Sequence, residues 1–139
     1  MTPKSEFLEA RGLRFHYRDW GGTGDPLVFL HGLASNARIW DLTAPFLSGG
    51  FRVVALDQRG HGLSDKPDGG YDFASVSGDL AAFVQALGLK RPALAGHSWG
   101  ANVALQFAAD RPEGVSALAL VDGGFLEISA IEGMTWEGT

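Results

Sequence analysis

A serine flanked by glycines is the residue in this sequence that is best placed to do chemistry. Residues 96–100 read Gly-His-Ser-Trp-Gly, so that Ser98 has a glycine two positions away on each side. A short apolar run precedes the motif and an amphipathic stretch follows it, and a sharp strand-to-helix turn of this kind presents a serine as a nucleophile. The glycines remove side chains that would collide where strand and helix approach each other. We therefore expect Ser98 to attack carbonyl carbon atoms.

A serine that attacks a carbonyl group needs hydrogen-bond donors for the oxyanion that forms. The helix expected after Ser98 would direct free N–H groups and its positive dipole end toward this oxygen. We expect the backbone N–H groups of Trp99 and Leu33 to form the oxyanion hole, and His31, Gly32 and Trp99 to line the substrate pocket. His31 is expected to hold its loop by hydrogen bonds. The indole of Trp99 either faces the substrate or only packs.

Other polar residues of the sequence are expected to have structural roles. The polar stretch that begins at Asp57 reads DQRGHGLSD and follows another apolar run. Asp57, Arg59 and His61 are expected to form a turn network that shapes the wall of the site without taking part in catalysis. His97 is expected to point away from the nucleophile and to pack. His16 is expected in an early strand on the far side of the sheet.

Short apolar runs alternate with amphipathic stretches, and these are the elements that must position the candidate residues. We expect strands at 7–9, 13–18, 27–30, 52–56, 92–95 and 115–121, and helices at 36–47, 73–87 and 99–109. Fully apolar strands are typical of a parallel sheet that is buried on both faces. The pattern therefore predicts an α/β fold, a mostly parallel sheet with helices on both faces. Chemistry in such sheets lies beyond the carboxyl ends of the strands.

The helical spacing also predicts which side chains are buried. Asp72 or Ser75 is expected to cap the helix over 73–87, and Pro45 weakens the C-terminal end of the helix over 36–47. The apolar positions expected to be buried in the first and third helices are Ile39, Trp40, Leu42, Phe46, Leu47, Val103, Leu105 and Phe107.

Composition limits the classes of protein that fit. The chain has 139 residues, 45% of them hydrophobic, which is enough for one packed domain. Its 11 basic and 16 acidic residues give a net charge of −5, which argues against nucleic acid and anionic membranes as partners. The absence of cysteine excludes disulfides and thiolate metal sites. The first residues have no apolar signal core and no apolar run is long enough to span a membrane, so we expect a cytoplasmic protein.

Three motifs in order, HGL at 31–33, DQRGHGLSD and GHSWG, resemble the α/β-hydrolase family. The serine hydrolases of the bromoperoxidase, esterase and lactonase-like branch look most similar, and the resemblance runs from about Phe7 to Val121. It implies that residues 1–124 are the N-terminal part of the core domain, with six of roughly eight strands. It also implies Ser98 as nucleophile and the N–H groups of Leu33 and Trp99 as oxyanion hole. Haloalkane dehalogenases and epoxide hydrolases of this family carry aspartate at the nucleophile position, and a serine there argues against both activities.

The resemblance implies a triad in the chain order nucleophile, acid, histidine, and this order leaves Ser98 without a base. The four histidines, at positions 16, 31, 61 and 97, all precede Ser98. Asp122, at the end of the sixth expected strand, is a candidate acid. The alternative is a structural turn aspartate, which the following Gly123 and Gly124 favour. A serine without a base is a poor nucleophile, so we expect the chain alone to be nearly inert.

Residues 125–139 resemble the start of a cap or lid region that is cut short. A sixth strand without a neighbour would leave an apolar edge that invites pairing. We therefore expect a fragment, a truncated gene product or one part of a two-chain assembly. The expected partners are a small-molecule substrate and either a complementing C-terminal chain or a second copy paired through the edge strand.

Three functions fit these observations. The first is a hydrolase of small esters, lactones or related carbonyl compounds that works through an acyl-enzyme on Ser98 and needs no cofactor or metal. The second is a non-catalytic binding or receptor module, and the third is a truncated product without function. The retained motifs favour the hydrolase, because a binding module has no need of a strained nucleophile turn. Perhydrolases, C–C bond hydrolases and acyltransferases would keep the same motifs.

Overall fold

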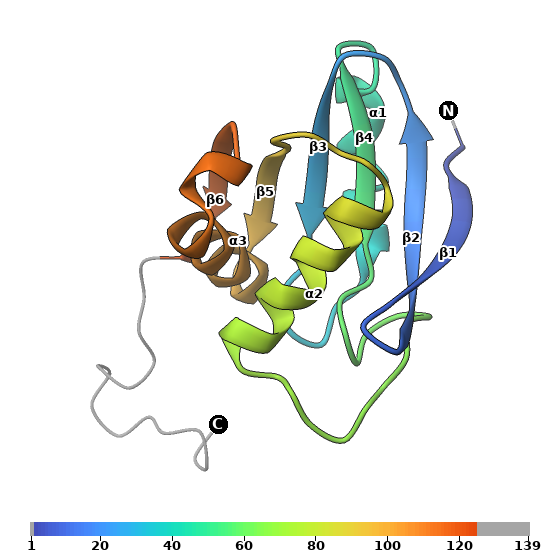
Figure 1. Cartoon of the computed structure of the whole chain (residues 1–139). Coiled ribbons are helices and arrows are strands. Elements are labelled where there is room, and N and C mark those ends of the chain that lie inside the picture. The colour runs from blue at the N-terminus through green and yellow to red at the C-terminus, as the bar shows by residue number, and fades with distance from the viewer. Residues whose placement is uncertain (1, 125–139) are drawn as a thin grey trace.

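A β-sheet lies at the centre of the protein in the computed structural model, which describes residues 2–124 (Figure 1). Within these residues the sheet has six strands in the order β1-β2-β4-β3-β5-β6. The strands are β1 Lys4–Ala10, β2 Leu13–Gly21, β3 Asp25–Leu30, β4 Phe51–Leu56, β5 Ala93–His97 and β6 Ala117–Val121. The expected start of a cap region over residues 125–139 lies outside the described residues.

The strands that carry the candidate residues run parallel to one another. β3 pairs with β4 and with β5, and β5 pairs with β6, all in parallel register. β1 and β2 extend the sheet in antiparallel fashion beside β4. The loops that follow β3, β4, β5 and β6 therefore lie together at the carboxyl ends of the parallel strands, where α/β proteins place their sites. The predicted α/β fold with a mostly parallel sheet is confirmed.

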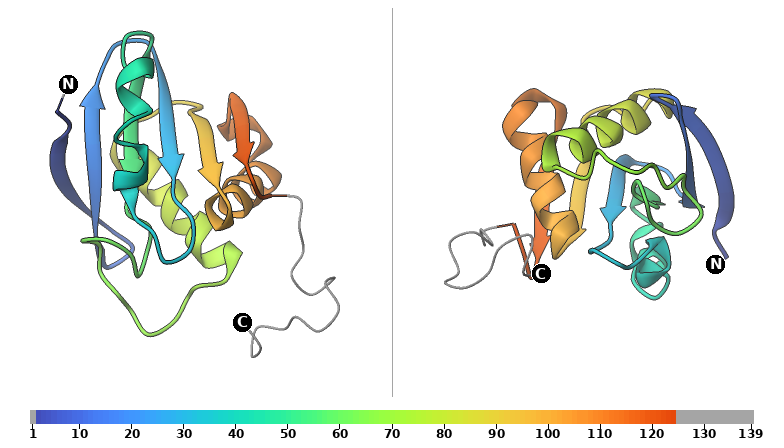
Figure 2. Two further views of the ribbon diagram at one scale, coloured as in Figure 1. Left: turned by 180° about the vertical axis from the view of Figure 1, so that it is seen from behind. Right: turned by 90° about the horizontal axis from the view of Figure 1, so that it is seen from below.

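Helices cover both faces of the sheet. They are η1 Ala37–Trp40, α1 Ala44–Leu47, α2 Phe73–Ala86, α3 Trp99–Asp110 and η2 Pro112–Gly114. Figures 1 and 2 show α2 and α3 on one face and α1 with the preceding η1 on the other. The core under α2 and α3 contains Phe83 and Leu30, both fully buried. On the opposite face Trp40 stacks on Phe29, with 4.3 Å between ring centroids. Helices on both faces were expected and are confirmed.

The single helix expected over 36–47 is wrong. The chain forms the short η1 and α1 instead, separated by a turn. Pro45 lies in the first turn of α1, a position that suits proline because no N–H is needed there, so the proline begins a new helix. The break changes the face that each side chain presents: Leu42 and Phe46 are 86% and 88% exposed, and Ile39 is exposed as well. Their predicted burial is therefore wrong.

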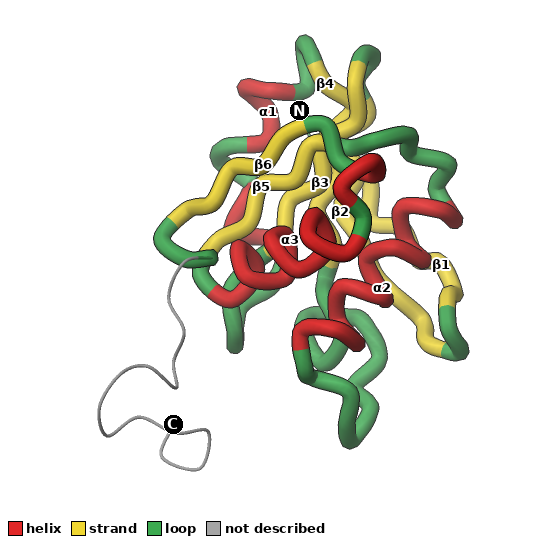
Figure 3. Tube along the Cα trace, turned by 60° about the vertical axis from the view of Figure 1, so that its left-hand side comes forward, coloured by secondary structure: helices red, strands yellow, loops and turns green. Residues whose placement is uncertain are grey.

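Burial predictions also fail at the β6 edge of the sheet. Every residue of β6 is exposed, although the sequence predicts a buried strand here. Leu105, on the neighbouring α3, is 41% exposed instead of buried. Figure 3 shows β6 at one edge of the sheet, and the described residues supply nothing that covers its outer side. Apolar periodicity indicates which face of a helix or strand is apolar. That face becomes buried only where another element packs against it.

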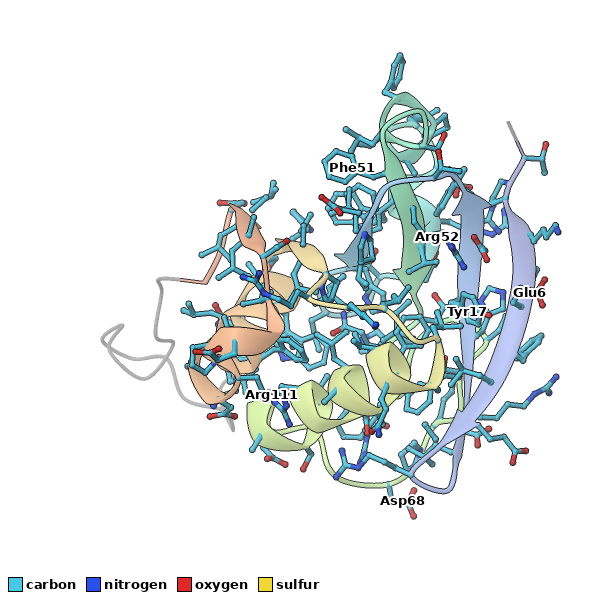
Figure 4. All side chains as sticks on the ribbon, turned by 45° about the horizontal axis from the view of Figure 1, so that its top comes forward. Glu6, Tyr17, Phe51, Arg52, Asp68 and Arg111 are labelled. Carbon is cyan, nitrogen blue, oxygen red and sulfur yellow. The ribbon has the colours of Figure 1, made fainter. Side chains whose placement is uncertain are left out.

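The opposite edge is held by charged and aromatic side chains of neighbouring strands. Glu6, Tyr17 and Arg52 come from β1, β2 and β4, and Figure 4 shows them on this side of the molecule. Arg52 pairs with Asp19, with 2.6 Å between Nη1 and Oδ1. Burial raises the pKa of Tyr17, and the nearby carboxylate of Glu6 raises it further. The ion pair between β2 and β4 and the buried phenol fix the antiparallel part of the sheet.

Candidate active site

Ser98 occupies a strained turn between β5 and α3. Its φ is 54° and its ψ −117°, and helix α3 begins at the next residue. Such a backbone conformation costs a non-glycine residue about 1–3 kcal/mol and persists only when its surroundings impose it. Ser98 is exposed even though both neighbouring elements are largely buried. The turn therefore presents the hydroxyl group at the carboxyl end of the sheet, as the sequence predicted for a nucleophile.

Close backbone contacts hold this turn in place. A Cβ on Gly96 would collide with the carbonyl group of Gly100, and a Cβ on Gly100 would lie 2.6 Å from the carbonyl oxygen of Leu30. On the other side a Cβ on Gly123 would lie 2.8 Å from the Cα of Ser98. Only glycine fits where backbones approach so closely. The spacing of the two motif glycines thus has a direct structural cause, and Gly123 is a third such residue that the motif does not include.

The loop after β3 lies directly against the Ser98 turn. A Cβ on Gly32 would lie 3.3 Å from the Cβ of Ser98, which is close van der Waals contact. The next residue, Leu33, has a 59% exposed side chain. Within residues 2–124 the backbone N–H groups of Leu33 and Trp99 donate to no protein acceptor. The structure therefore brings both predicted donors to the same strand ends as Ser98.

His31 holds the loop that carries Gly32 and Leu33. Its buried ring accepts a hydrogen bond at Nε2 from the Gln58 N–H (3.0 Å), and its Nδ1 lies 2.7 Å from the Gly32 carbonyl oxygen. The side chain of Gln58 donates in return to the His31 carbonyl oxygen (2.8 Å). Burial lowers the pKa of His31 to about 4, so the ring is neutral at neutral pH. This confirms the prediction that His31 holds its loop by hydrogen bonds.

An aromatic wall stands beside the nucleophile turn. The indole of Trp99 is 7% exposed and lies 5.6 Å from the ring of His61 and 6.3 Å from that of Phe73. The ring of His61 lies in turn 4.8 Å from that of His31 and accepts a hydrogen bond from the Ala34 N–H (3.1 Å). The sequence left open whether the Trp99 indole faces the substrate or only packs, and in the structure most of its surface is packed against other residues.

Asp57 organises the loop that follows β4. Its carboxylate accepts hydrogen bonds from the N–H groups of Ala37 (2.8 Å) and Leu63 (3.0 Å). The carboxylate also occupies the place that a Cβ on Gly62 would take. The same carboxylate lies 2.7 Å from Nδ1 of His16. Asp57 thus ties together three segments that are far apart in the sequence, and it has the structural role that was expected of it.

His16 lies in an early strand, as expected, but its ring contacts Asp57 at the carboxyl end of β4. His16 belongs to β2, and β2 pairs antiparallel with β4 so that Tyr17 lies opposite Leu56. The residue before Tyr17 therefore lies beside the residue after Leu56, which is Asp57. The topology was needed to see this, because the sequence alone does not tell which strand neighbours β4.

A buried ion cluster that sequence reasoning missed anchors the same loop to α2. Asp79 is 1% exposed and accepts two hydrogen bonds from Arg59, at 2.8 and 2.9 Å. Arg11 donates a third hydrogen bond to Asp79 at 3.0 Å. The signal in the sequence is an acidic residue on the apolar face of an amphipathic helix, next to Val76 and Leu80. A buried carboxylate there requires cationic partners.

Asp122 and His97 both lie close to the nucleophile turn. Asp122 follows β6, is exposed and has a φ of 53°. β6 is joined to the turn because the Ser98 N–H donates to the Val121 carbonyl oxygen (2.9 Å). The Nδ1 atom of His97 is buried and has no hydrogen-bond partner among residues 2–124. His97 lines a cavity of about 280 Å³ together with Ser35, Ile39, Trp40, Thr43 and Val121.

None of the four histidines forms a hydrogen bond with Ser98 or with Asp122 in the described part of the chain. His16 and His31 are bound to other residues through both ring nitrogens. His61 bonds to the Arg59 carbonyl oxygen and the Ala34 N–H. The described residues also contain no helix long and apolar enough to cross a membrane. The candidate site thus combines a strained serine, two free N–H donors and an adjacent exposed carboxylate.

The chain belongs to the α/β-hydrolase family. The family model described as alpha/beta hydrolase fold matches residues 25–137, which includes the loops that follow β3, β4, β5 and β6. Family membership agrees with the resemblance expected from the three motifs.

Two curated relatives and one solved structure show how the similarity is distributed. The chain is 40% identical over 116 residues to an N-formylmaleamate deformylase from Pseudomonas putida, covering 83% of this chain and 43% of that protein. It is 40% identical over 112 residues to a non-heme chloroperoxidase from Streptomyces lividans, covering 79% and 41%. The crystal structure of Cfl2 from Burkholderia cenocepacia matches with a TM-score of 0.89 at 34% identity, covering 97% of this chain and 46% of that one. The chain thus spans less than half the length of these relatives.

Proposed function

We propose that this protein is the nucleophile-bearing part of a serine hydrolase that acts on small esters, lactones or related carbonyl compounds. The observation that carries the proposal is the conformation of Ser98, with a φ of 54° in an exposed turn between β5 and α3. The backbone contacts of the turn impose this positive φ, but they involve no side-chain atom of Ser98 and so do not require a serine here. Strain of this kind clusters at functional sites, where it holds a reactive group in position.

The proposed reaction is acyl transfer in two steps. The Oγ of Ser98 attacks the substrate carbonyl carbon, and the negative charge that forms on the carbonyl oxygen is stabilised by the N–H groups of Leu33 and Trp99. The carbon–oxygen bond to the leaving alcohol then breaks, and the alcohol departs with the proton from Ser98. Water hydrolyses the acyl-enzyme and restores the hydroxyl group. One such N–H donor typically contributes about 10²–10³-fold to kcat.

The proposal requires a base from outside the described residues. Free serine is a weak nucleophile at neutral pH, and within residues 2–124 none of the four histidines forms a hydrogen bond with Ser98. We propose that a further polypeptide segment pairs with the exposed edge of β6 and brings this base to Ser98, with Asp122 as a candidate acid. A complementing C-terminal chain fits this role. A dimer formed through β6 would cover this edge, but the second copy would bring only the same four histidines.

The chemistry of the site defines the proposed substrate class. A serine nucleophile with an oxyanion hole suits any carbonyl carbon that bears a leaving group. The relatives named as a deformylase and a chloroperoxidase indicate that this part of the family supports more than one reaction. Esters and lactones are therefore proposed as the broad class.

Hydrolysis of an unactivated substrate tests the proposal. Protein expressed with the coding sequence that follows residue 139 should hydrolyse a short alkyl ester or a γ-lactone, and Ser98→Ala should lower kcat by about 10⁴-fold or more. Ser75→Ala is the matched control, because Ser75 lies in the first turn of α2, where its hydroxyl donates to the capping residue Asp72, and its loss should leave kcat unchanged. Full activity in folded Ser98→Ala would overturn the proposal. Tight ligand binding without turnover would favour the non-catalytic binding module.

A further inference from the structure

Ser5 is hydrogen-bonded to a histidine, and this histidine is hydrogen-bonded in turn to an aspartate. The Oγ of Ser5 lies 2.6 Å from Nε2 of His16, and Nδ1 of His16 lies 2.7 Å from Oδ2 of Asp57. The three side chains come from β1, β2 and the loop after β4. Serine, histidine and carboxylate joined in this order form the arrangement that activates a serine hydroxyl for nucleophilic attack.

The neighbours of His16 determine which ring nitrogen carries the proton. An ionised carboxylate only accepts hydrogen bonds, so the Nδ1 atom facing Asp57 must be the donor. Nε2 of the neutral ring is then an acceptor, and the hydroxyl of Ser5 donates to it. The ring therefore stands ready to take the proton of Ser5, and Asp57 is the positioning residue that fixes this tautomer.

His16 and Asp57 are buried and held by hydrogen bonds, whereas Ser5 is open to solvent. His16 and Asp57 are each 3% exposed, whereas Ser5 is exposed. The Asp57 carboxylate is held by the N–H groups of Ala37 and Leu63. The backbone of His16 is held by Ser64, whose Oγ accepts the His16 N–H (2.8 Å) and donates to the Asp57 carbonyl oxygen (2.6 Å). A reagent in solution can therefore reach the Ser5 hydroxyl group, while the histidine that would accept its proton is held in place.

We propose that Ser5 is a second reactive serine of this protein, which accepts acyl groups from activated carbonyl compounds such as aryl esters. Oγ of Ser5 attacks the ester carbonyl carbon while its proton passes to Nε2 of His16. The bond between this carbon and the phenolic oxygen breaks, the phenolate takes the proton from His16, and an O-acyl-Ser5 remains. An activated ester needs little oxyanion stabilisation because its phenolate leaves readily, so the site suits aryl esters and not alkyl esters.

The location of Ser5 separates this site from the one proposed around Ser98. β1 and β6 form opposite edges of the sheet, as Figure 1 shows. A segment that pairs with β6 to complete the Ser98 site would leave β1 uncovered. The Ser5 site contains its own histidine, whereas Ser98 has none among the described residues. Reactivity at Ser5 therefore does not depend on the proposed function of Ser98.

Site-resolved acylation tests the proposal. The purified chain is exposed briefly to p-nitrophenyl acetate, and the rate of acetylation of each serine is measured by mass spectrometry of its peptides. General-base assistance contributes about 10²–10⁴-fold, so acetylation of Ser5 should be at least about 100-fold faster than that of Ser75. Ser75 is the matched internal control, since its hydroxyl donates to a carboxylate (Asp72) and has no histidine partner.

Two further measurements distinguish a reactive serine from a merely structural hydrogen bond. His16→Gln should lower the rate at Ser5 by about 100-fold without changing the rate at Ser75. If that variant does not fold, the wild-type chain in concentrated urea serves instead, because unfolding separates Ser5 from His16 and should abolish the excess reactivity. Equal rates at Ser5 and Ser75, or an unchanged rate at Ser5 in folded His16→Gln or in urea, would overturn the proposal.

Discussion

The backbones of Gly96 and Gly100 touch across the turn that carries Ser98. A Cβ atom on Gly96 would overlap the carbonyl group of Gly100 and lie 2.6 Å from the N–H nitrogen of Ala101. The last residues of β5 and the first turn of α3 are therefore packed backbone against backbone. This contact is what allows a strand to turn into a helix over a single residue, and it forces Ser98 to adopt its positive φ.

Gly96→Ala should destabilise the fold because the added methyl group meets backbone atoms that have no room to move. Overpacking a close contact costs about 1–3 kcal/mol, and a backbone contact lies at the upper end of this range. Gly49→Ala is the matched control, since a Cβ there meets nothing within 4 Å, and it should change stability by less than about 0.5 kcal/mol. Urea unfolding of the three proteins measures both effects. Equal stability of the two variants would contradict the packing described for the turn.

Asp79→Asn should be strongly destabilising because it leaves two arginines near a neutral side chain in the interior. Removing one partner of a buried ion pair costs about 3–5 kcal/mol. Asp79 is fully enclosed and bonded to both Arg59 and Arg11, so the loss should lie within this range. Asp110→Asn is a suitable control because, within residues 2–124, the exposed Asp110 side chain bonds only to Gln106. Urea unfolding should show a large shift for the first variant and almost none for the second.

Acid should weaken the fold through His31. Burial lowers its pKa to about 4 in the folded protein, whereas the ordinary value of 6.5 applies when the chain is unfolded. The unfolded chain therefore takes up this proton first as the pH falls. The stabilisation is complete above pH 6.5 and is lost between pH 6.5 and about 4, with a total of about 3 kcal/mol from the shift.

NMR titration of the imidazole ring checks this prediction directly. The ring signals of His31 should stay constant down to about pH 5 and change only near pH 4. His31→Gln should lose the part of the acid sensitivity that belongs to this ring, as measured by urea unfolding at about pH 7 and about pH 5. A ring that titrates near its ordinary value would contradict the buried, neutral state described here.

The backbone N–H of Leu33 should contribute to catalysis in a protein that carries the missing base. Leu33→Pro removes this N–H, whereas Leu33→Ala changes the exposed side chain and keeps the donor. Loss of one oxyanion-hole donor lowers kcat by about 10²–10³-fold, so the proline variant should show this loss and the alanine variant should not. Circular dichroism establishes that both variants are folded. Similar activity of the two variants would place the oxyanion donors elsewhere.

Local sequence patterns were sufficient to predict the strands, two of the helices and the turn at Ser98. Each of these depends on neighbouring residues: the apolar runs of β3 and β4, the cap at Asp72 with its side chain bonded to the Ser75 N–H, and the glycines around Ser98. Features that depend on residues close together in the sequence could therefore be predicted from the sequence.

Predictions failed where the outcome depended on elements that are distant in the sequence. Phe46 and Leu105 are apolar at helical positions, yet they are exposed because nothing in the described chain covers them. The contact of His16 with Asp57 depends on β2 lying next to β4, and the burial of Asp79 on two arginines from other segments. Such contacts are set by the order of strands in the sheet, which periodicity does not reveal.

The central claim is that Ser98 is a nucleophile, and mapping the site of a covalent label tests it most directly. Protein expressed with the coding sequence beyond residue 139 is treated with a fluorophosphonate, and the labelled peptides are identified by mass spectrometry, which separates Ser98 from Ser5. We predict stoichiometric labelling at Ser98, its loss in folded Ser98→Ala, and slow labelling of Ser98 in the 139-residue chain alone. A folded, complete protein whose Ser98 peptide stays unmodified would contradict the account.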